Sequence, residues 1–473
     1  MAQPNIIFLL IDDLGCRDLG CFGSSFYETP NLDRMASEGI RFENAYASAP
    51  VCSPTRASIL SGQYPARVGV THYIGGQDTG RLASVPYLHY LPLEQKSIAT
   101  ALKAGGYQTW HLGKWHLGDE DFYPEQHGFD CNIGGCHAGH PNNGYFAPWK
   151  LPTLEEAPTG TYLTDHLTDQ AINLIHNRGD KPFFLNFWHY AVHTPIQAPE
   201  HLIKKYQAKA KRLQLDQVNP IIEGEPFPCL HKSDQHITRR VLQSDPAYAA
   251  MIENLDTNIG RLLDALEQEG LTEDTLIVMT SDNGGLSTAE GAPTCNAPMS
   301  EGKGWAYEGG VRVCQLARWP GRIPAGSLNH ENVTSTDLYP TFLEAAQLPL
   351  IPEQHVDGIS LLDAMTMNKA IPERPIFWHF PHYGNQGDSP SASVLEGEWK
   401  LIQHFENSEL ELYNLEDDVS EAKNIADQKP EIVNRLYHKL RTWQSEVEAK
   451  IPEANSEWAQ RLKYPKIENN AHI

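Results

Sequence analysis

The sequence has no long hydrophobic run and little basic charge. The longest apolar stretch covers residues 6–11 of 473, far fewer than the roughly 20 residues that cross a bilayer. Lys and Arg number 37 against 60 Asp and Glu, a net charge of −23, which argues against nucleic-acid binding and docking on anionic membranes. An anionic substrate would therefore need a local cationic pocket.

Cysteine is also sparse. The eight cysteines form no C-x-x-C pair and no dense framework, so we do not expect a disulfide scaffold. Cys131 and Cys136 could pair across the sequence NIGG, or both could remain reduced thiols. The first residues contain neither the basic segment nor the cleavage site of a signal peptide. We expect a cytoplasmic protein or, if a leader was removed, a periplasmic or secreted one.

Four apolar runs end abruptly in polar residues, as buried parallel strands do. Helical patterns lie between them, most clearly from Pro246, with apolar residues at helical spacing as far as Leu266 and a stop at Gly270. This alternation predicts an α/β sandwich around a mostly parallel, mixed sheet, with ligands beyond the carboxyl ends of the strands. The runs are NIIFLLI, YQTWHLG, PFFLNFW and TLIVMTS.

The end of the chain has a different pattern. After about residue 370 come short strand-like pieces and then a helical pattern near residues 430–449. We predict a catalytic α/β domain over residues 1–370. Residues 371–473 are predicted to form a smaller α+β domain with an antiparallel sheet and a terminal helix. Residues 200–245 look like an insertion, whose lysines favour a solvated helix face.

An all-oxygen set follows two of the predicted strands. Asp12 and Asp13 follow the first, and Asp282 and Asn283 follow the last. Three carboxylates and a carboxamide suit a hard divalent cation, and calcium tolerates an irregular oxygen cage better than magnesium does. Zinc fits poorly, because no histidine or thiolate belongs to the group. Either pair alone could be turn or capping residues; two pairs at two strand ends favour a metal.

Three cations could bind a tetrahedral anion. Lys114 and His116 lie two positions apart and would point the same way on an extended segment. Lys303 is flanked by glycines that let the backbone approach a ligand, and Arg56 completes the set. Each lysine alone could be a surface residue. His193 has metal-ligand spacing from His189, but the strand before and Pro195 after favour a loop.

The sequence CSPTRASILSG from Cys52 predicts a short helix. Ser53 suits the N-cap, Pro54 the first helical position and Gly62 the end. The positive end of this helix would face Cys52, as a nucleophile acting on an anion requires. Cys52 could equally be a partly buried thiol before an ordinary helix. With the metal set, the residues favour a metal-assisted hydrolase of an anionic ester.

These segments resemble a known family. Cys52, Pro54 and Arg56 match the C-x-P-x-R motif of the type I sulfatases, which belong to the alkaline-phosphatase-like superfamily. The similarity covers most of residues 4–325, and the tail is similar to the C-terminal end of the family. The other matching segments are NIIFLLIDDLG, TPNLDRMASEGIRFENAYA, GYQTWHLGKWHLG, HTPIQAP, TSDNGG and GKGWAYEGGVRV.

The resemblance implies roles for these residues. A formylglycine-generating, or sulfatase-maturing, enzyme would oxidise Cys52 to formylglycine, whose hydrate is the nucleophile and a calcium ligand. Arg56 would steady that hydrate, and His116 would help to break the covalent intermediate. His193 would lie near the leaving oxygen. The remaining matches are the calcium ligands Asp12, Asp13, Asp282 and Asn283, and the sulfate-binding lysines Lys114 and Lys303.

The substrate expected from this resemblance is a sulfated carbohydrate, of galactose or N-acetylgalactosamine type, cut at a chain end. Its specificity would come from polar and aromatic loops that contain His72, His137 and His382. Ordinary surface loops are the other interpretation. Alternative functions are a broad arylsulfatase, a phosphonate or phosphodiester hydrolase of the same superfamily, and a non-catalytic binder of sulfated glycans. The sequence Asp282-Asn283 favours a sulfatase, since the phosphate-type relatives usually have histidine after this aspartate.

Overall fold

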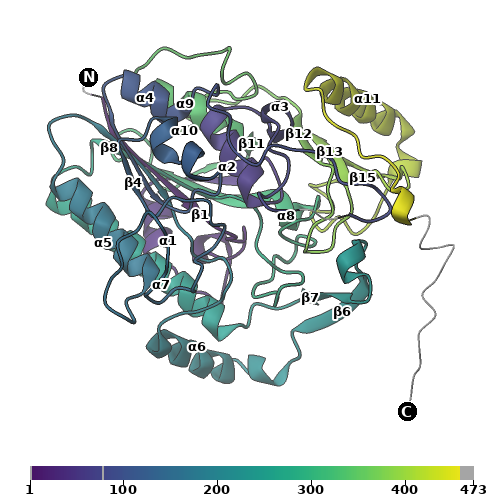
Figure 1. The fold of residues 1–473 in the computed structure, drawn as a ribbon, viewed down its shortest axis with the longest axis horizontal. Coiled ribbons are helices and arrows are strands. Elements are labelled where there is room, and N and C mark those ends of the chain that lie inside the picture. Colours follow the sequence, from purple (N-terminus) through teal and green to yellow (C-terminus); the bar gives the residue numbers. More distant parts are fainter. Residues whose placement is uncertain (1–2, 77–78, 459–473) are drawn as a thin grey trace.

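The computed structural model describes residues 3–76 and 79–458. Nine strands of this part form one mixed sheet, in the order β10-β2-β9-β8-β1-β5-β3-β4, with β11 paired to β2 (Figure 1). The four predicted strands are its adjacent, parallel centre. The strands are β1 (Asn5–Ile11), β2 (Ile40–Tyr46), β3 (Gln108–Gly113), β4 (Cys131–Ile133), β5 (Phe183–Trp188), β8 (Thr275–Ser281), β9 (Arg312–Arg318), β10 (Ser327–Asn329) and β11 (Val333–Thr334).

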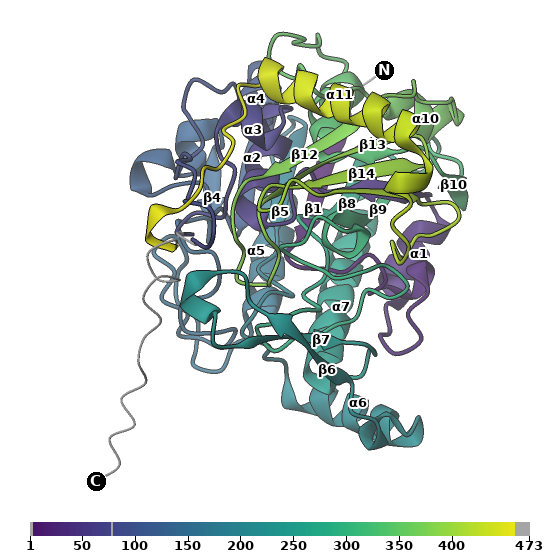
Figure 2. The same cartoon turned by 90° about the vertical axis from the view of Figure 1, so that its right-hand side faces the viewer.

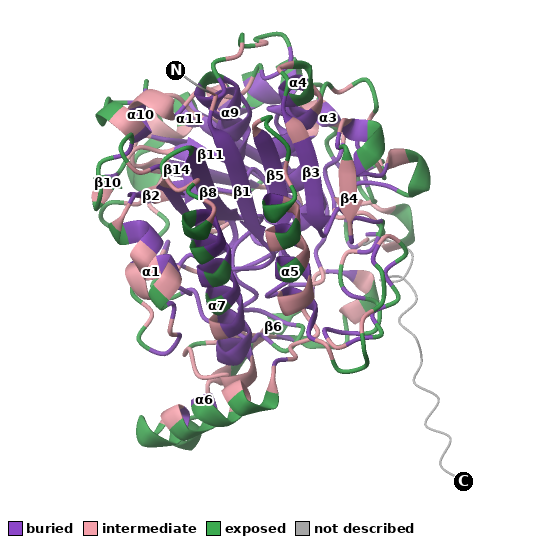
Figure 3. Ribbon diagram, turned by 90° about the vertical axis from the view of Figure 1, so that its left-hand side faces the viewer, coloured by how far each residue is buried: buried purple, intermediate pink, exposed green. Residues whose placement is uncertain are grey.

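Helices cover both faces of this sheet, which confirms the predicted α/β sandwich. The first group, with α7 at its centre, packs on one face, and the second group, around α9, packs on the other (Figures 1 and 3). The first group is α1 (Pro30–Ser37), α5 (Leu163–His176) and α7 (Pro246–Gln268), and α6 (Glu200–Arg212) packs on α7 beyond the sheet; the second is α2 (Cys52–Ser61), α4 (Ile98–Ala104), α9 (Leu338–Ala345) and α10 (Leu362–Met367). The short helices α3 (Pro65–Val68) and α8 (Glu308–Val311) lie in connections.

The α7 helix follows the sequence prediction closely. Asp245 caps it by accepting hydrogen bonds from the backbone N–H groups of Ala247 and Tyr248, and Gly270 follows its end with a φ of 69°. Its apolar stripe is buried and its other face is exposed (Figure 3). No helix in the described part of the chain is long and apolar enough to cross a membrane.

The predicted insertion carries a helix and a hairpin. The helix α6 packs against α7 by burying Tyr206, while its lysine-rich face is exposed as predicted (Figure 3). Strands β6 (Ile221–Pro226) and β7 (His236–Arg240) pair antiparallel below the main body (Figure 2). All eight cysteines are free thiols, so the pairing considered for Cys131 and Cys136 does not occur.

A second, antiparallel sheet forms the C-terminal part, as predicted. Its order is β12-β13-β14-β15, and α11 (Pro430–Glu446) lies across it (Figure 2). Trp443 of α11 stacks on Phe377, and Tyr64 of the larger part meets both rings edge-on. The boundary near residue 370 stays a prediction, and residues 459–473 of the predicted domain lie outside the described residues. The strands are β12 (Ile376–Phe380), β13 (Ser391–Glu396), β14 (Trp399–His404) and β15 (Leu410–Asn414).

Candidate active site

The four central strands bring the predicted polar residues to one edge of the sheet. Asp12 and Asp13 follow β1, and Asp282 and Asn283 follow β8, its hydrogen-bonded neighbour. All four side chains are buried. The backbone N–H of Asp13 donates to Oδ1 of Asp282 (3.2 Å), and Asn283 Nδ2 donates to Oδ1 of Asp13 (2.8 Å). Strand order therefore joins two pairs that are 269 residues apart in the sequence.

The helix α2 begins at Cys52, and Cys52 faces His116. The Sγ atom of Cys52 lies 3.3 Å from Nδ1 of His116, and both residues are buried. Gly62 ends the helix with a φ of 69°, as predicted. The predicted N-cap is wrong: Val51 holds that position without a side-chain bond, and the Ser53 hydroxyl donates to the His116 carbonyl instead (3.0 Å). A tertiary partner has replaced the local one. Because the helix begins at Cys52, Pro54 is its third residue and not, as predicted, its first.

Arg56 lies one turn into α2 and is fully buried. Its Nε and Nη2 both donate to Oδ2 of Asp282, at 2.9 and 2.7 Å, and its Nη1 donates to the Lys114 carbonyl (2.9 Å). The guanidinium also lies 5.1 Å from the ring centre of Trp188, the last residue of β5. Arg56 thus fixes α2 against three of the four central strands.

Two lysines approach the first pair of aspartates. Lys114 Nζ donates to Oδ2 of Asp12 (2.7 Å), and Lys303 Nζ donates to Oδ2 of Asp13 (2.9 Å). Burial alone would lower the pKa of Lys303, but Asp13 and other acidic neighbours raise it above its ordinary value, so this ammonium stays charged. The segment after β3 is not extended as predicted, because His116 has a φ of 57°.

His193 lies in a loop after β5, as predicted, beside Asp13. Its Nε2 is 3.7 Å from Oδ2 of Asp13. Its Nδ1 lies 2.8 Å from the Thr194 carbonyl, which can only accept, so Nδ1 carries the proton. Burial and the nearby Lys303 hold the pKa of His193 well below its ordinary value. The ring is therefore neutral at rest and a strong acid once protonated.

The two adjacent aspartates have different environments. Burial raises the pKa of Asp12 well above its usual range, and Lys114 offsets only part of this. Burial acts in the same direction on Asp13, but the charge of Lys303, together with Lys114 and a hydrogen bond from Asn283, outweighs it and holds the pKa of Asp13 below its usual range. Asp13 is therefore ionised, whereas Asp12 needs a further positive charge nearby to be ionised.

These residues fit a hard cation. Single ligand atoms of Asp12, Asp13 and His193 lie within 4.8 Å of one another. Oδ1 of Asp12 and Oδ1 of Asn283 are buried without a hydrogen-bond partner among the described residues. Buried acceptors without donors favour a bound cation, and the oxygen donors favour calcium. The expectation that no histidine belongs to this group is wrong, because the structure brings His193 to it. Asp282 was predicted to be a calcium ligand, but both of its carboxylate oxygens already accept hydrogen bonds. Arg56 donates to Oδ2, and the backbone N–H of Asp13 donates to Oδ1.

The predicted specificity residues occupy different places. His72 and His382 are buried, and their rings stack on each other with centres 4.4 Å apart. Both residues therefore belong to loops, as predicted, but their side chains point into the protein and are not exposed. His137 is exposed, and its Nδ1 lies 3.1 Å from the Tyr123 hydroxyl. The neighbouring His140 lies closer to the candidate site, since its ring is parallel to that of His193 at 6.2 Å.

Sequence reasoning missed Glu290 as a neighbour of the site, whereas Gln386 lies in the predicted specificity loop that also contains His382. Gln386, from the C-terminal part, is buried against Gly304, where a Cβ would lie 2.6 Å from its Oε1. Its Nε2 donates to Glu290 (2.9 Å), which also acts electrostatically on Lys303. Gly304, next to Lys303, was the available signal in the sequence. A glycine is needed at this position because Gln386 of the C-terminal part packs directly on it.

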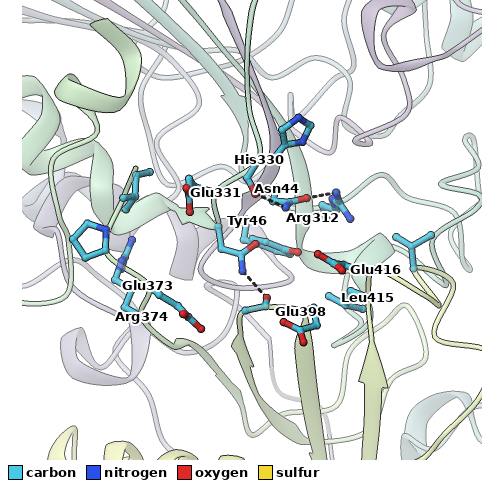
Figure 4. Close-up of a pocket in the computed structure, with 15 residues that line it drawn as sticks. Asn44, Tyr46, Arg312, His330, Glu331, Glu373, Arg374, Glu398, Leu415 and Glu416 are labelled. Atoms are coloured by element: carbon cyan, nitrogen blue, oxygen red, sulfur yellow. Dashed lines mark hydrogen bonds between the residues drawn. The ribbon is translucent and has the colours of Figure 1, made fainter. Parts of the chain in front are cut away.

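A separate cavity of about 700 Å³ lies between the two sheets (Figure 4). Asn44 and Tyr46 of β2 and Arg312 of β9 line one side of it, and Glu398 and Glu416 line the other. None of the predicted catalytic or metal-binding residues lines it. The cavity therefore belongs to the contact between the two sheets and not to the candidate site at the ends of the four central strands.

Comparison with known proteins agrees with this geometry. The family profile described as "Sulfatase" matches residues 4–348, and that of "N-sulphoglucosamine sulphohydrolase, C-terminal" matches residues 302–446. The chain belongs to the sulfatase family. Enzymes of this family generally use Ca²⁺ and a formylglycine, and this sulfatase has a group of residues that could hold a metal.

Individual relatives of this sulfatase extend the similarity. It is 33% identical to N-acetylgalactosamine-6-sulfatase of Canis lupus familiaris, over 85% of this chain and 72% of the relative. It is 30% identical to a sulfatase of Formosa agariphila, over 93% and 88% of the two chains. The crystal structure of Ps i-CgsB matches with a TM-score of 0.75 and 26% identity over 98% of both chains, and the same protein was also solved in complex with k-i-k-neocarrahexaose.

Proposed function

We propose that this sulfatase removes sulfate from a sulfated carbohydrate, using formylglycine at position 52 and one Ca²⁺. The observation that carries the proposal is the contact between Cys52 and His116 (3.3 Å) at the start of α2, within the strand-end cluster of carboxylates and cations. A nucleophile, a base and a set of cations thus meet in one buried place.

Formylglycine at position 52 is supported by the sequence around Cys52. Pro54 and Arg56 match the modification motif, so a sulfatase-maturing enzyme is the expected partner. The Sγ of Cys52 then marks where an oxygen of the hydrated aldehyde would lie. When present, formylglycine supplies a hydroxyl nucleophile for sulfur and a second hydroxyl through which the sulfate can be released.

Calcium would be held by the strand-end oxygens. Asp12, Asp13 and Asn283 offer carboxylate and carboxamide oxygens, two of them without hydrogen-bond partners among the described residues, and Asp282 lies beside them. Bound there, Ca²⁺ would supply positive charge that stabilises the sulfuryl oxygens during the reaction. The added charge would also favour ionised Asp12, whose pKa burial raises.

The cationic side chains of this chain would bind and orient the sulfate group. Lys114 and Lys303 are charged donors next to the aspartates, and both are anchored by short contacts (2.7 and 2.9 Å). Fixed donors cost no reorganisation when charge develops on the sulfuryl oxygens. Arg56, held by Asp282, would steady the hydrate at position 52.

The two histidines would move protons at different atoms. His193 would protonate the departing sugar hydroxyl from Nε2, since its Nδ1–H is directed to the Thr194 carbonyl. Its low pKa makes the protonated ring a strong acid. His116 would take a proton at Nδ1 from the group at position 52. General acid or base catalysis of this kind contributes about 10²–10⁴ in rate.

The substrate class is inferred from relatives. N-acetylgalactosamine-6-sulfatase is 33% identical to this chain, and Ps i-CgsB, at 26% identity, was solved with k-i-k-neocarrahexaose. These names support a sulfate ester on a galactose- or N-acetylgalactosamine-type sugar. We further propose removal from a chain end, with the exposed His140, whose ring lies beside that of His193, in one wall of the sugar site.

A panel of defined substrates tests this proposal. Protein coexpressed with a maturing enzyme is assayed for sulfate release from sulfated galactose and N-acetylgalactosamine, carrageenan oligosaccharides, an aryl sulfate and a phosphonate ester. The C52A variant serves as the control for contaminating activity. We expect the fastest turnover on a sulfated sugar with a free chain end. Release only from the aryl sulfate, or faster turnover of the phosphonate ester, would contradict the carbohydrate assignment.

A further inference from the structure

The Ser53 hydroxyl has an unusual position for the residue after a nucleophile. It is fully buried and joins two separate segments. Its Oγ donates to the carbonyl of His116 (3.0 Å) and accepts from the backbone N–H of Ile74 (3.2 Å). One hydroxyl group can make both bonds, because it has one donor and two acceptor lone pairs. Ser53 therefore ties the loop that contains His116 to the loop that contains Ile74.

The Ile74 loop in turn determines which nitrogen of His116 carries the proton. The His116 Nε2 lies 3.2 Å from the Ile74 carbonyl oxygen. A carbonyl can only accept, so Nε2 must be the protonated nitrogen and Nδ1 the one with a free lone pair. That lone pair is directed at Cys52, with Nδ1 and Sγ 3.3 Å apart. The contacts form a closed ring from Cys52 through Ser53, Ile74 and His116 back to Cys52.

The backbone of His116 needs such support. Its φ of 57° lies in the left-handed region, which a residue with a Cβ adopts at an energetic cost. Its N–H donates to the Cys136 carbonyl (3.0 Å), and Ser53 holds its C=O on the other side of the same residue. Gly139 backs the ring, since a Cβ there would lie 2.7 Å from its Cε1. Ring and backbone are thus fixed from opposite sides.

We propose that Ser53 is a positioning residue, which holds the ring of His116 in the tautomer that keeps Nδ1 free as the base facing residue 52. This inference rests on the proposed function, in which Nδ1 of His116 is the base that takes a proton from residue 52. Ser53 acts through Ile74 and His116 and does not itself contact the substrate. The motif C-x-P-x-R leaves its second position open, so the requirement for the hydroxyl belongs to the folded site and not to the modification of Cys52.

Two measurements on S53A test the proposal, with S58A as the matched control. Ser58 is a buried serine of the same helix, and its Oγ has no hydrogen-bond partner in the described part of the chain. The first measurement is ¹⁵N NMR of histidine-labelled full-length protein made without the maturing enzyme, with the His116 signals assigned by their loss in H116Q. The second is steady-state kinetics of matured protein on the best sulfate ester, with formylglycine content determined by mass spectrometry.

We expect wild type and S58A to have His116 protonated at Nε2 and bare at Nδ1, and S53A to have a mixture of both tautomers. The kcat of S53A should fall by about 10–100-fold at unchanged KM and equal formylglycine content, as misplacement of a catalytic group predicts. An unchanged tautomer in S53A, or an unchanged kcat, would overturn the proposal. If matured wild type hydrolyses no sulfate ester, the proposed function fails, and the NMR measurement still decides whether Ser53 holds the tautomer.

Discussion

Two buried networks of charged side chains in the described part of the chain differ in character, and one of the two has the features of an active site. The first is the strand-end cluster, in which Asp12, Asp13 and Asp282 meet Arg56, Lys114 and Lys303. The second, the interface cluster, consists of Glu308 of α8, Lys400 of β14 and Glu421. Lys400 Nζ lies 2.9 Å from a carboxylate oxygen of each glutamate, and all three side chains are buried.

The two networks differ in what is left unpaired. In the interface cluster one ammonium is shared by two carboxylates, and each carboxylate oxygen faces a donor. Oε1 of Glu421 has only the ion pair with Lys400 (2.9 Å) and no hydrogen bond among the described residues. The Tyr46 hydroxyl and the backbone N–H of Glu308 donate to Glu308 and Glu421, at 3.1 and 2.7 Å. In the strand-end cluster Oδ1 of Asp12 has no hydrogen-bond donor among the described residues, and a thiol and two imidazoles adjoin the charges.

Buried charge alone does not identify a catalytic site. A buried network whose members satisfy one another holds the fold together, and here it joins the second sheet to α8 beside the cavity of Figure 4. A buried network with spare acceptors and proton carriers has remaining capacity for a cation and a substrate. The following predictions separate the two networks by their effects on activity and on stability.

Metal removal should affect only the strand-end cluster, with the largest effect. We expect exhaustive chelation to lower turnover by at least about 10³-fold, because the carboxylate oxygens would lose the charge that offsets them and the sulfuryl oxygens. Added Ca²⁺ should restore activity better than Zn²⁺, as an oxygen donor set predicts. Sulfate release after chelation and after each addition measures this. Unchanged turnover in metal-free protein would mean that the oxygen set is structural.

The K400M variant should affect only the interface cluster. Removing the ammonium leaves Glu308 and Glu421 buried without their shared cation, which should lower the free energy of unfolding by about 3–5 kcal/mol. The kcat of the folded fraction should stay at the wild-type value, since no catalytic candidate contacts Lys400. Denaturant unfolding and turnover at low temperature measure the two effects. A loss of kcat without a loss of stability would reverse the assignment of the two networks.

Glu421 should make stability depend on pH. Burial raises the pKa of Glu421 from 4.5 to about 7, so the folded protein binds this proton more tightly than the unfolded chain does. The stabilisation from this group is therefore complete below about pH 4.5 and is lost as the pH rises to about 7. It amounts to on the order of 3 kcal/mol, since one pKa unit corresponds to about 1.4 kcal/mol. In E421Q this component should vanish, which unfolding curves at several pH values can measure. An identical pH dependence in both proteins would exclude Glu421 as its source.

An exposed ion pair should have the smallest effect. Lys205 on α6 lies 2.6 Å from carboxylate oxygens of both Glu28 and Glu253, but its side chain is 42% exposed. We expect K205A to lower the free energy of unfolding by no more than about 1 kcal/mol, because water and salt screen such pairs. It serves as the exposed counterpart of K400M in the same unfolding experiment. Equal losses in the two variants would show that burial does not distinguish them.

Much of the fold could be predicted from the sequence. The four central strands and α7 follow hydrophobic patterns that no tertiary contact contradicts, and the carboxyl ends of parallel strands meet at one edge of a sheet. Asp12 and Asp282 could therefore be joined without a structure. The antiparallel C-terminal sheet and its helix followed from the same periodicity.

The failures occurred where a distant partner decides the local conformation. Ser53 is a good N-cap by itself, but the carbonyl of His116 takes its hydroxyl. The segment at His116 looked extended, but its φ is positive because Cys136 and Ser53 hold it from both sides. His72 and His382 do lie in loops, but their rings are buried and stack on each other. Local sequence propensity cannot predict such contacts, because the partner residues lie tens to hundreds of positions away in the sequence.

The chemical state of residue 52 in active enzyme tests the central claim most directly. Protein coexpressed with a sulfatase-maturing enzyme is digested, and the peptide that contains position 52 is analysed by mass spectrometry beside the turnover of the same sample. We predict that activity rises in proportion to the fraction of Cys52 converted to the aldehyde, and that protein with an intact thiol is inactive. Full activity in a sample whose Cys52 is entirely unmodified would contradict the account.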